Sequence, residues 1–240
     1  MARRVARLTL DNLPDLAGSC ASCVFWQLDP VSRDRAAGHE ADELSAWLSE
    51  VLREWGSCGR ILYVDDQPAG HVLYAPAVHV PGADQFPTAP VSPDAVLLVA
   101  VRVNPSYVGG GLGRVLVQSM AKDLIKRGGI AAVEAFGHTG GTARQSCVLP
   151  ADFLLGVGFR THRAHDRYPR MRMDLRSVLT WRGELEAALD RLLSAGRGGV
   201  PVRAPASPPT ARNPTPRAAA QPASPAIRPK IRPEGVARPL

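Results

Sequence analysis

The feature that most constrains this chain is an almost uninterrupted apolar segment, Ala95–Val103, which is followed by a glycine-rich stretch. Such a segment is typical of a β-strand that is buried on both faces. Asn104 and Pro105 end it, residues 109–113 hold four glycines, and a helical apolar pattern then continues to Gly128. A second apolar strand pattern covers residues 130–136. Strand, helix and strand in this order predict a βαβ unit with parallel strands.

Around this unit, short strand patterns alternate with helical ones, which predicts a mixed α/β fold. We expect these further elements at residues 4–10 (strand), 39–55 (helix), 60–64 and 69–75 (a hairpin around a turn at 65–68), 150–155 (the start of a short helix), 168–175 (strand) and 181–193 (helix). Residues 76–93 hold five prolines and no periodicity, so they are predicted to form a long loop.

A change in composition divides the chain. Residues 201–240 hold 11 of the 22 prolines, seven basic residues, one acid and no aromatic residue, so they carry +6 of the net charge of +7. A segment this poor in apolar residues cannot offset the entropy of ordering. We expect a folded domain at residues 1–195 and a disordered tail at 196–240. The tail either solubilises the chain or makes weak, salt-dependent contacts with nucleic acid or an acidic partner.

Other classes of protein are excluded by composition. No apolar run is long enough for a transmembrane helix, and the N-terminus lacks the apolar stretch of a secretory signal. Four cysteines do not make a disulfide scaffold in a chain of this length, so we expect a cytoplasmic protein. Cys20 and Cys23 have metal-ligand spacing, but no second pair of this kind follows, and no metal is expected. The alternative is a site closed in space by Cys147 or His39.

A glycine-rich turn between a buried strand and a helix commonly binds phosphate through backbone N–H groups. This one is no P-loop, because no Gly-Lys-Ser/Thr follows. In its full context, VRVNPSYVGGGLGRVL from Val101, it strongly resembles the acetyl-CoA loop of the GNAT-type N-acyltransferase superfamily. That loop reads strand, x-Pro-x-x-Arg/Gln-x-x-Gly-x-Gly/Ala, helix. Gly111 and Gly113 match its two glycines, and Val108 replaces its Arg/Gln.

A second motif supports this resemblance. Members of the superfamily often carry Asn-x-x-Ala-x-x-Phe-Tyr-x-x-x-Gly-Phe after the following strand, and residues 147–159 read CVLPADFLLGVGF. Phe153, Gly158 and Phe159 align with that motif. Leu154 replaces the tyrosine that protonates the departing CoA thiolate in relatives, and Cys147 replaces the asparagine. The apolar strand also lacks the glutamate that many relatives use as a base.

The resemblance, which covers roughly residues 3–176, implies a largely antiparallel sheet with a central parallel βαβ unit and flanking helices. It also implies that acetyl-CoA is the co-substrate, that the loop N–H groups hold its pyrophosphate, and that the end of the preceding strand pairs with its pantetheine arm. The residues assigned to the cofactor in this way are Val101, Arg102, Val103, Val108, Gly109, Gly110, Gly111, Leu112, Gly113 and Arg114.

The resemblance further implies that a substrate amine attacks the thioester directly in a ternary complex, which needs groups that move protons. Glu134 is the first candidate base, because it lies in an apolar strand where burial would raise its pKa. A paired structural glutamate is the alternative. His138, just past that strand, could relay a proton, and Cys147 could protonate the thiolate. A solvated histidine and a buried apolar thiol are the corresponding alternatives. We expect Val24, Phe25 and Trp26 to form part of the acceptor pocket wall.

Two hypotheses about function remain. The first is an N-acetyltransferase that moves an acetyl group from acetyl-CoA to an unknown amine, either a small molecule or a protein amine. The second is a catalytically degenerate, regulatory acyl-CoA-binding module, which the missing tyrosine favours. The sequence leaves open whether the chain forms a homodimer.

Overall fold

A computed structural model describes residues 2–140 and 147–176. The predicted helix at 181–193 and the predicted tail at 196–240 lie outside these residues. The strands are β1 (Arg3–Arg7), β2 (Gly59–Val64), β3 (Gln67–Ala75), β4 (Ala95–Val103), β5 (Ala132–His138), β6 (Leu149–Pro150), β7 (Arg160–Arg163) and β8 (Arg170–Asp174). The α-helices are α1 (Pro30–Arg35), α2 (Glu40–Glu54), α3 (Leu112–Arg127) and α4 (Ala151–Gly156), and the 3-10 helices are η1 (Leu13–Asp15), η2 (Gly18–Ser22), η3 (Ala77–His79), η4 (Pro81–Gln85) and η5 (Pro105–Tyr107).

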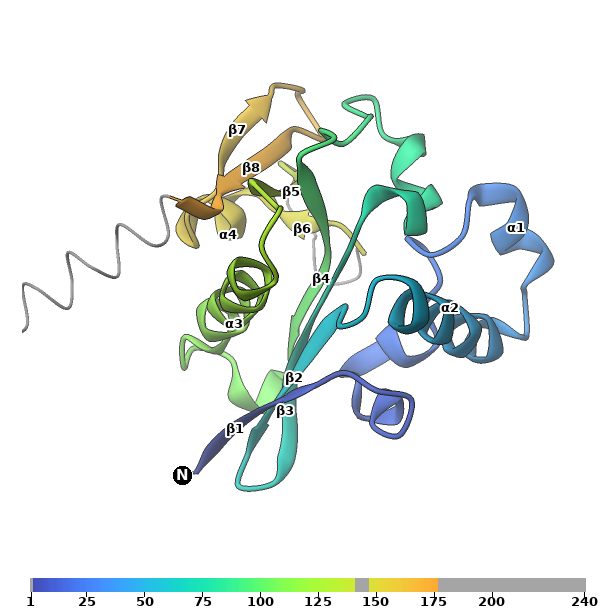
Figure 1. Cartoon of the computed structure of the whole chain (residues 1–240), viewed down its shortest axis with the longest axis vertical. Helices are drawn as coiled ribbons and strands as arrows, with labels where there is room; N and C mark the ends of the chain where they lie inside the picture. Colours follow the sequence, from blue (N-terminus) through green and yellow to red (C-terminus); the bar gives the residue numbers. More distant parts are fainter. Residues whose placement is uncertain (1, 141–146, 177–240) are drawn as a thin grey trace, which may run out of the picture. The chain divides into compact units, whose positions relative to one another are not determined.

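The strands form one sheet in the order β1-β2-β3-β4-β5-β8-β7, with the short β6 also paired to β5 (Figure 1). The β4–β5 and β5–β6 pairs are parallel, and the other neighbours are antiparallel. This confirms the predicted fold class and the parallel βαβ unit of β4, α3 and β5. No helix of the described residues is long and apolar enough to cross a bilayer.

The central pair of strands is joined at one end only. β4 and β5 pair from Ala95 with Ala132 to Leu97 with Glu134, and no pairing between them continues beyond that point. On its other side β4 contains a bulge, because Leu73 of β3 faces Ala100 while the next β3 residue faces Leu98. Val99 is therefore the extra residue, and a bulge of this kind bends its strand. The C-terminal half of β4 consequently has a backbone edge that β5 does not cover.

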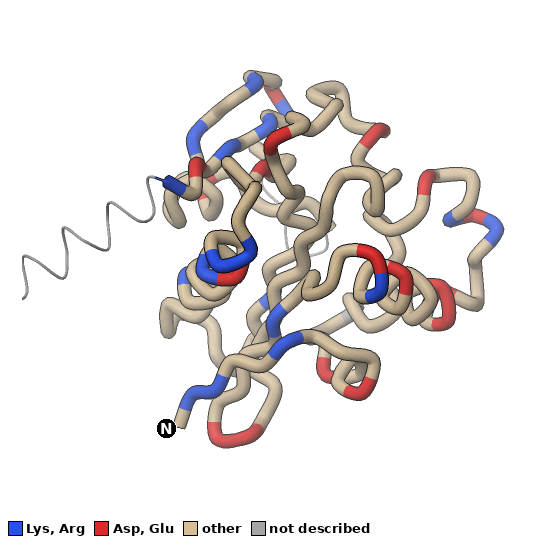
Figure 2. Tube along the Cα trace, in the orientation of Figure 1, with Lys and Arg blue, Asp and Glu red and all other residues tan. Residues whose placement is uncertain are grey.

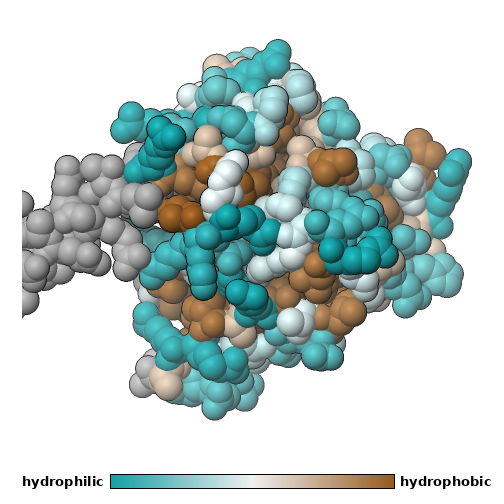
Figure 3. Space-filling model, in the orientation of Figure 1, coloured by the Kyte–Doolittle hydropathy of each residue, from teal (hydrophilic) through white to brown (hydrophobic). Residues whose placement is uncertain are grey.

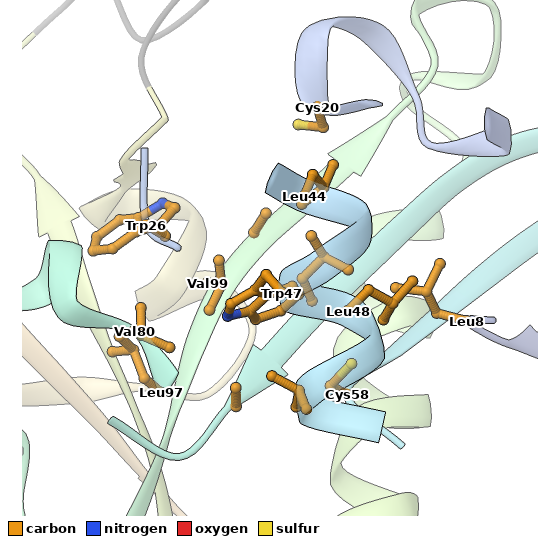
Figure 4. Close-up of a cluster of buried hydrophobic side chains, with 14 of the residues drawn as sticks. Leu8, Cys20, Trp26, Leu44, Trp47, Leu48, Cys58, Val80, Leu97 and Val99 are labelled. Carbon is orange, nitrogen blue, oxygen red and sulfur yellow. The ribbon is translucent and has the colours of Figure 1, made fainter. Parts of the chain in front are cut away.

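Each face of the sheet buries its own apolar core. α3 and α4 cover one face, where Leu116, Met120 and Leu124 of α3 are fully buried. α2 and the N-terminal segment cover the other face, on the opposite side of the sheet in Figure 1. Figure 4 shows Trp47 of α2 beside Val99 of β4 on that face, and Leu48 of α2 beside Leu8. The three- and four-residue spacing of apolar side chains that predicted α2 and α3 is the spacing that places them against the sheet.

Two segments differ from their sequence predictions. The predicted loop at 76–93 contains η3 and η4, and it buries Val80, Ala83 and Phe86 against the core. β7 was not predicted, because every one of its residues is exposed and it carries no alternation of apolar side chains. An edge strand with charged side chains of this kind is protected from pairing with other chains. Figure 2 shows several Lys and Arg positions along β7 and β8.

Candidate functional site

The glycine-rich stretch makes a sharp turn between β4 and α3. Asn104 Oδ1 accepts a hydrogen bond from the Ser106 N–H at 3.2 Å and thereby starts η5 directly after the strand. Gly109 and Gly111 then have φ angles of 91° and 71°, which favour glycine because a Cβ is strained there. Gly111 is the N-cap of α3 and no side chain caps the helix. The first N–H groups of α3 therefore remain available to an anion at the positive end of the helix dipole.

A cleft of about 410 Å³ opens beside this turn. Its lining residues are Val103, Tyr107, Val108, Gly109, Gly111, Leu112, Gly113, Arg114, Phe153, Gly156 and Val157. The lining is mostly apolar, and the Val108 side chain is 72% exposed at its rim. Figure 3 shows apolar surface on this side of the molecule, near the start of α3. A volume of this size is within the range of small-molecule and cofactor sites.

Two contacts between α3 and α4 hold the walls of the cleft together. A Cβ on Gly113 would lie 2.9 Å from Cε2 of Phe153, so only glycine allows the helix to approach this ring. Arg114 Nη2 donates to the Gly156 carbonyl at 2.6 Å, which joins the first turn of α3 to the last residue of α4. Arg114 is thus held at the cleft by the protein itself.

Most of the residues assigned to the cofactor from sequence line this cleft. Gly110 belongs to the same turn, whereas the Val101 side chain is buried in the α3-side core and Arg102 lines a cavity elsewhere. Sequence analysis left Tyr107, Phe153, Gly156 and Val157 out of the site. The motif alignment of Phe153 was the signal that could have placed it there.

A second, small cavity lies on the α2 side of β4. It measures about 20 Å³, and its lining residues are Cys20, Cys23, Trp26, Gln27, Leu73, Val99, Ala100, Arg102 and Cys147. The bulge explains why the consecutive residues Val99 and Ala100 both line it. A cavity of this size accommodates a water-sized molecule. Three cysteines line it, and Cys147 is far from Cys20 and Cys23 in the sequence.

Trp26 forms the aromatic wall of this cavity. Its ring stacks on Phe86 and Phe136 with centroid distances of 5.1 and 6.0 Å, and its side chain is 3% exposed. The indole N–H donates to the Cys147 carbonyl at 2.9 Å. Trp26 therefore joins the N-terminal segment to the segment before β6.

Cys147 lies 3.3 Å from Cys23, measured between the two sulfurs. The hydrogen bond between the two sulfurs lowers the pKa of Cys23 to about 6 and raises the pKa of Cys147. The nearby Arg102 and Arg33 guanidinium groups also favour the Cys23 thiolate. Of the three predicted catalytic residues, Cys147 is the one that lines this cavity; Glu134 and His138 do not.

Glu134 is fully buried at the end where β4 and β5 are paired. Arg170 Nη1 and Arg172 Nη1 lie 3.1 and 3.2 Å from its carboxylate, and the Ser92 N–H donates to it at 3.1 Å. Burial raises its pKa, but the Ser92 hydrogen bond and the two arginines outweigh burial, so that the pKa is lowered. The sequence prediction of a raised pKa is wrong, because the arginines come from β8.

Arg172 extends this cluster to the protein surface. Its guanidinium binds both carboxylate oxygens of Asp94, at 3.0 and 2.7 Å, and Nε donates to Asp174 at 3.0 Å. The ion pair with Arg172 lowers the pKa of Asp94. The resulting cluster clamps β4, β5 and β8 together.

Two histidines lie near these sites. His138 ends β5, its ring centroid is 5.6 Å from that of Tyr168, and its buried Nδ1 has no hydrogen-bond partner among the described residues. His71, which sequence analysis did not single out, is fully buried on β3 opposite Arg102. Its Nδ1 accepts the Ala17 N–H at 3.0 Å, and burial lowers its pKa to about 3. His71 is therefore neutral, with its proton on Nε2.

The described residues contain one group of three potential metal ligands within 4.8 Å of one another, Glu50, Glu54 and His79. Neither Cys20 nor Cys23 belongs to that group. The described residues therefore do not bring Cys20 or Cys23 into a group of three potential ligands at that distance.

Comparison with known families identifies the class of protein. Residues 24–145, about half of the chain, match the model of the acetyltransferase (GNAT) family. The chain belongs to this family, whose members transfer acyl groups. Curated protein sequences give no significant match.

Solved structures show the same fold. The PaiA N-acetyltransferase from Thermoplasma acidophilum, in complex with coenzyme A, aligns with a TM-score of 0.50 and 12% identity, over 72% of this chain and 99% of that one. A putative GNAT-family acetyltransferase from Desulfovibrio desulfuricans aligns with a TM-score of 0.47 and 19% identity, again over 72% and 99% of the two chains. At 12% identity the likeness to the Thermoplasma protein concerns the fold alone, and the second alignment carries no argument.

Proposed function

We propose that this protein is an N-acetyltransferase that moves the acetyl group of acetyl-CoA to an amine. One observation carries the proposal. The uncovered edge of β4 leads from the glycine-turn cleft to the residues that line the small cavity on the other face. An elongated thioester lying along this edge would have its phosphates at one site and its reactive end at the other.

The cleft supplies what the CoA end of such a substrate requires. The pyrophosphate binds the N–H groups of the turn at residues 109–113 and the start of α3. The pantetheine arm pairs with the backbone of β4 between Val101 and Val103, where β5 leaves the edge uncovered. Tyr107 and Phe153 pack against the apolar parts of the ligand. In this arrangement the contacts come mainly from the backbone, so the absence of an Arg/Gln at Val108 does not remove the site.

The reactive end requires a nucleophile, a polarised carbonyl and a proton donor. The amine nitrogen attacks the thioester carbon, the carbonyl oxygen faces backbone N–H groups near the Val99 bulge, and the C–S bond then breaks. We assign the proton for the departing sulfur to the Cys147 thiol, and the removal of the amine proton to His138. Because the pKa of Cys147 is raised, its proton is released less readily than that of a free thiol. Its contribution should be at the lower end of the roughly 10²–10⁴-fold range for acid–base catalysis.

Glu134 has a positioning role in this proposal. Its carboxylate is held by Arg170, Arg172 and Ser92, and it lies where β4 and β5 are still paired. It therefore fixes the point from which the two strands separate.

A degenerate acyl-CoA-binding module is the second candidate function, and two observations favour it. Leu154, at the position of the tyrosine in relatives, is fully buried in the α3-side core. The cavity of about 20 Å³ would also have to enlarge to admit an amine substrate. Such a module would bind acetyl-CoA without transferring the acetyl group.

Calorimetric titration of the full chain with acetyl-CoA and with CoA tests the binding step. We expect saturable binding that weakens at least 100-fold in a Gly111→Glu variant, because its carboxylate opposes the phosphates. Gly38→Glu is the matched control, since Gly38 also has a positive φ, 87°, and open space around it. Loss of binding in both variants, or no binding by the native chain, would contradict the proposal.

Release of CoA in the presence of a panel of small amines and peptide N-termini then separates the two candidates. The acetyltransferase is supported if Cys147→Ser lowers the rate of acetyl transfer about tenfold and keeps the CoA affinity. Binding without transfer to any amine supports the module.

A further inference from the structure

The closest pair of cysteines in the described structure comes from two segments that are far apart in the sequence. Cys23 follows η2, Cys147 precedes β6, and their sulfurs are 3.3 Å apart although 124 residues separate them. The Trp26–Cys147 hydrogen bond at 2.9 Å holds the same two segments together. A disulfide requires a sulfur–sulfur distance of about 2.05 Å, so closing this pair needs an approach of little more than 1 Å.

The surroundings of the pair differ from those of an inert buried thiol. Both cysteines are partly exposed and both line the small cavity, which has room for a water-sized molecule. Arg102, which also lines the cavity, and Arg33 place positive charge near Cys23. Thiolate character together with access determines how readily a cysteine is oxidised.

We propose that Cys23 and Cys147 form an oxidation site at which a small peroxide converts the two thiols into a disulfide. The Cys23 thiolate attacks one oxygen of hydrogen peroxide, the O–O bond breaks, and Cys23 becomes a sulfenic acid as hydroxide leaves. The Cys147 sulfur then attacks the Cys23 sulfur. The S–S bond forms, and the thiol proton leaves with the sulfenic oxygen as water. The two sulfurs lose two electrons in total, and the peroxide is reduced to water and hydroxide.

The other two cysteines lack this combination of properties. Cys58 is fully buried, and burial raises its pKa to about 12. Cys20 lines the same cavity but is 8% exposed, and burial raises its pKa. The roles are therefore assigned to particular residues: Cys23 is oxidised first, and the Cys147 sulfur then attacks it to form the disulfide. Cys20 and Cys58 serve as internal controls.

Formation of the bond would also affect acyl transfer, and this consequence rests on the proposed function. The disulfide removes the Cys147 thiol and ties the two segments across the small cavity. Acetyl transfer should fall while CoA binding, which belongs to the cleft on the other face, stays unchanged. Reduction by dithiothreitol should restore transfer.

Peptide mapping of the full chain after treatment with hydrogen peroxide tests the proposal without reference to any activity. Trypsin releases residues 8–33, with both Cys20 and Cys23, and residues 145–160, with Cys147. We expect a linked pair of these peptides that disappears in Cys23→Ser and in Cys147→Ser but persists in Cys20→Ser and Cys58→Ser. A bond between Cys20 and Cys23, or thiols that stay reduced while the variants remain folded, would overturn the proposal.

The order of reaction gives a second readout. In the reduced protein at pH 7, iodoacetamide should label Cys23 at least tenfold faster than Cys58, because a thiol with a pKa near 6 is largely ionised at that pH. The groups that favour the Cys23 thiolate are the Cys147 thiol, the Phe25 backbone, Arg102 and Arg33, and they outweigh burial, which opposes it. Equal labelling rates for Cys23 and Cys58 would contradict the assignment of Cys23 as the first sulfur to react.

Discussion

The two ends of the β4–β5 pair differ in what holds them. At one end the strands are hydrogen-bonded, and a buried cluster of Glu134, Arg170 and Arg172 clamps them to β8. At the other end the strands are unpaired, and the glycine turn opens the cleft beside α3. The clamped end is built from charged side chains, whereas the open end is built largely from backbone. Under the proposed function, stability and ligand binding depend on opposite ends of the same two strands, so variants should separate them.

Removal of the central charge of the clamp should have the largest effect. Glu134→Gln leaves Arg170 buried without its carboxylate partner, and breaking a buried ion pair in this way costs about 3–5 kcal/mol. Urea denaturation measures the free energy of unfolding. CoA affinity of the folded variant should change much less than its stability. A loss below about 1 kcal/mol would show that the cluster does not hold this end together.

A side chain added at the open end should cost less stability than Glu134→Gln and should weaken CoA binding more. Gly113→Ala places a Cβ 2.9 Å from the Phe153 ring, and overpacking of this kind costs about 1–3 kcal/mol. Because α3 must move away from α4, CoA should also bind more weakly. Gly110→Ala is the control for stability, since its Cβ would lie no closer than 3.7 Å to another atom. Equal unfolding free energies for the two variants would contradict the tight contact.

Acid should weaken the clamped end first. The pKa of Glu134 is lower in the folded chain than the roughly 4.3 of an unfolded glutamate, so its ionisation stabilises the fold above that pH. This contribution is lost as the pH falls through the folded pKa, with a slope of at most about 1.4 kcal/mol per pH unit. Unfolding curves between pH 5 and pH 3 should therefore be steeper in pH for the native chain than for Glu134→Gln. If the free energy of unfolding has the same pH dependence in both proteins, Glu134 does not make this contribution.

The surface part of the clamp should contribute least. Asp94→Asn removes the partner that binds Arg172 at 2.7 and 3.0 Å, but the Asp94 side chain is 51% exposed. Exposed ion pairs contribute about 0–1 kcal/mol, so the expected loss of stability lies in that range and decreases in high salt. A loss as large as that of Glu134→Gln would mean that the buried and exposed parts act as one unit.

The sequence was sufficient to predict the central elements of the fold. Ala95–Val103 is apolar enough to specify a buried strand. The glycines after it are typical of a tight turn between a strand and a helix. β7 could not be predicted, because exposed Arg160 and Arg163 carry no periodic signal. The resemblance to the family assigned Gly111 and Gly113 to the cofactor, and both line the cleft. The structure adds Tyr107 and Phe153 to the residues that line it.

The side-chain clusters could not be predicted, for a different reason. The pKa of Glu134 depends on Arg170 and Arg172, which β8 brings beside β5 from more than thirty residues away. The Cys23–Cys147 contact likewise joins segments separated by 124 residues. Local patterns determine strands and turns, but the partners of a charge or thiol depend on the assembled sheet.

The contacts between α3 and α4 have a kinetic consequence. The Phe153 ring packs on Gly113, and the Arg114 side chain binds the Gly156 carbonyl, without any ligand. These contacts join the two walls of the cleft, so under the proposed function the site is preformed for CoA. A preformed site loses little conformational entropy when it is occupied, and its association rate is then set by diffusional encounter. We expect a single association phase whose observed rate constant rises linearly with CoA concentration, with no plateau from a slow rearrangement of these helices.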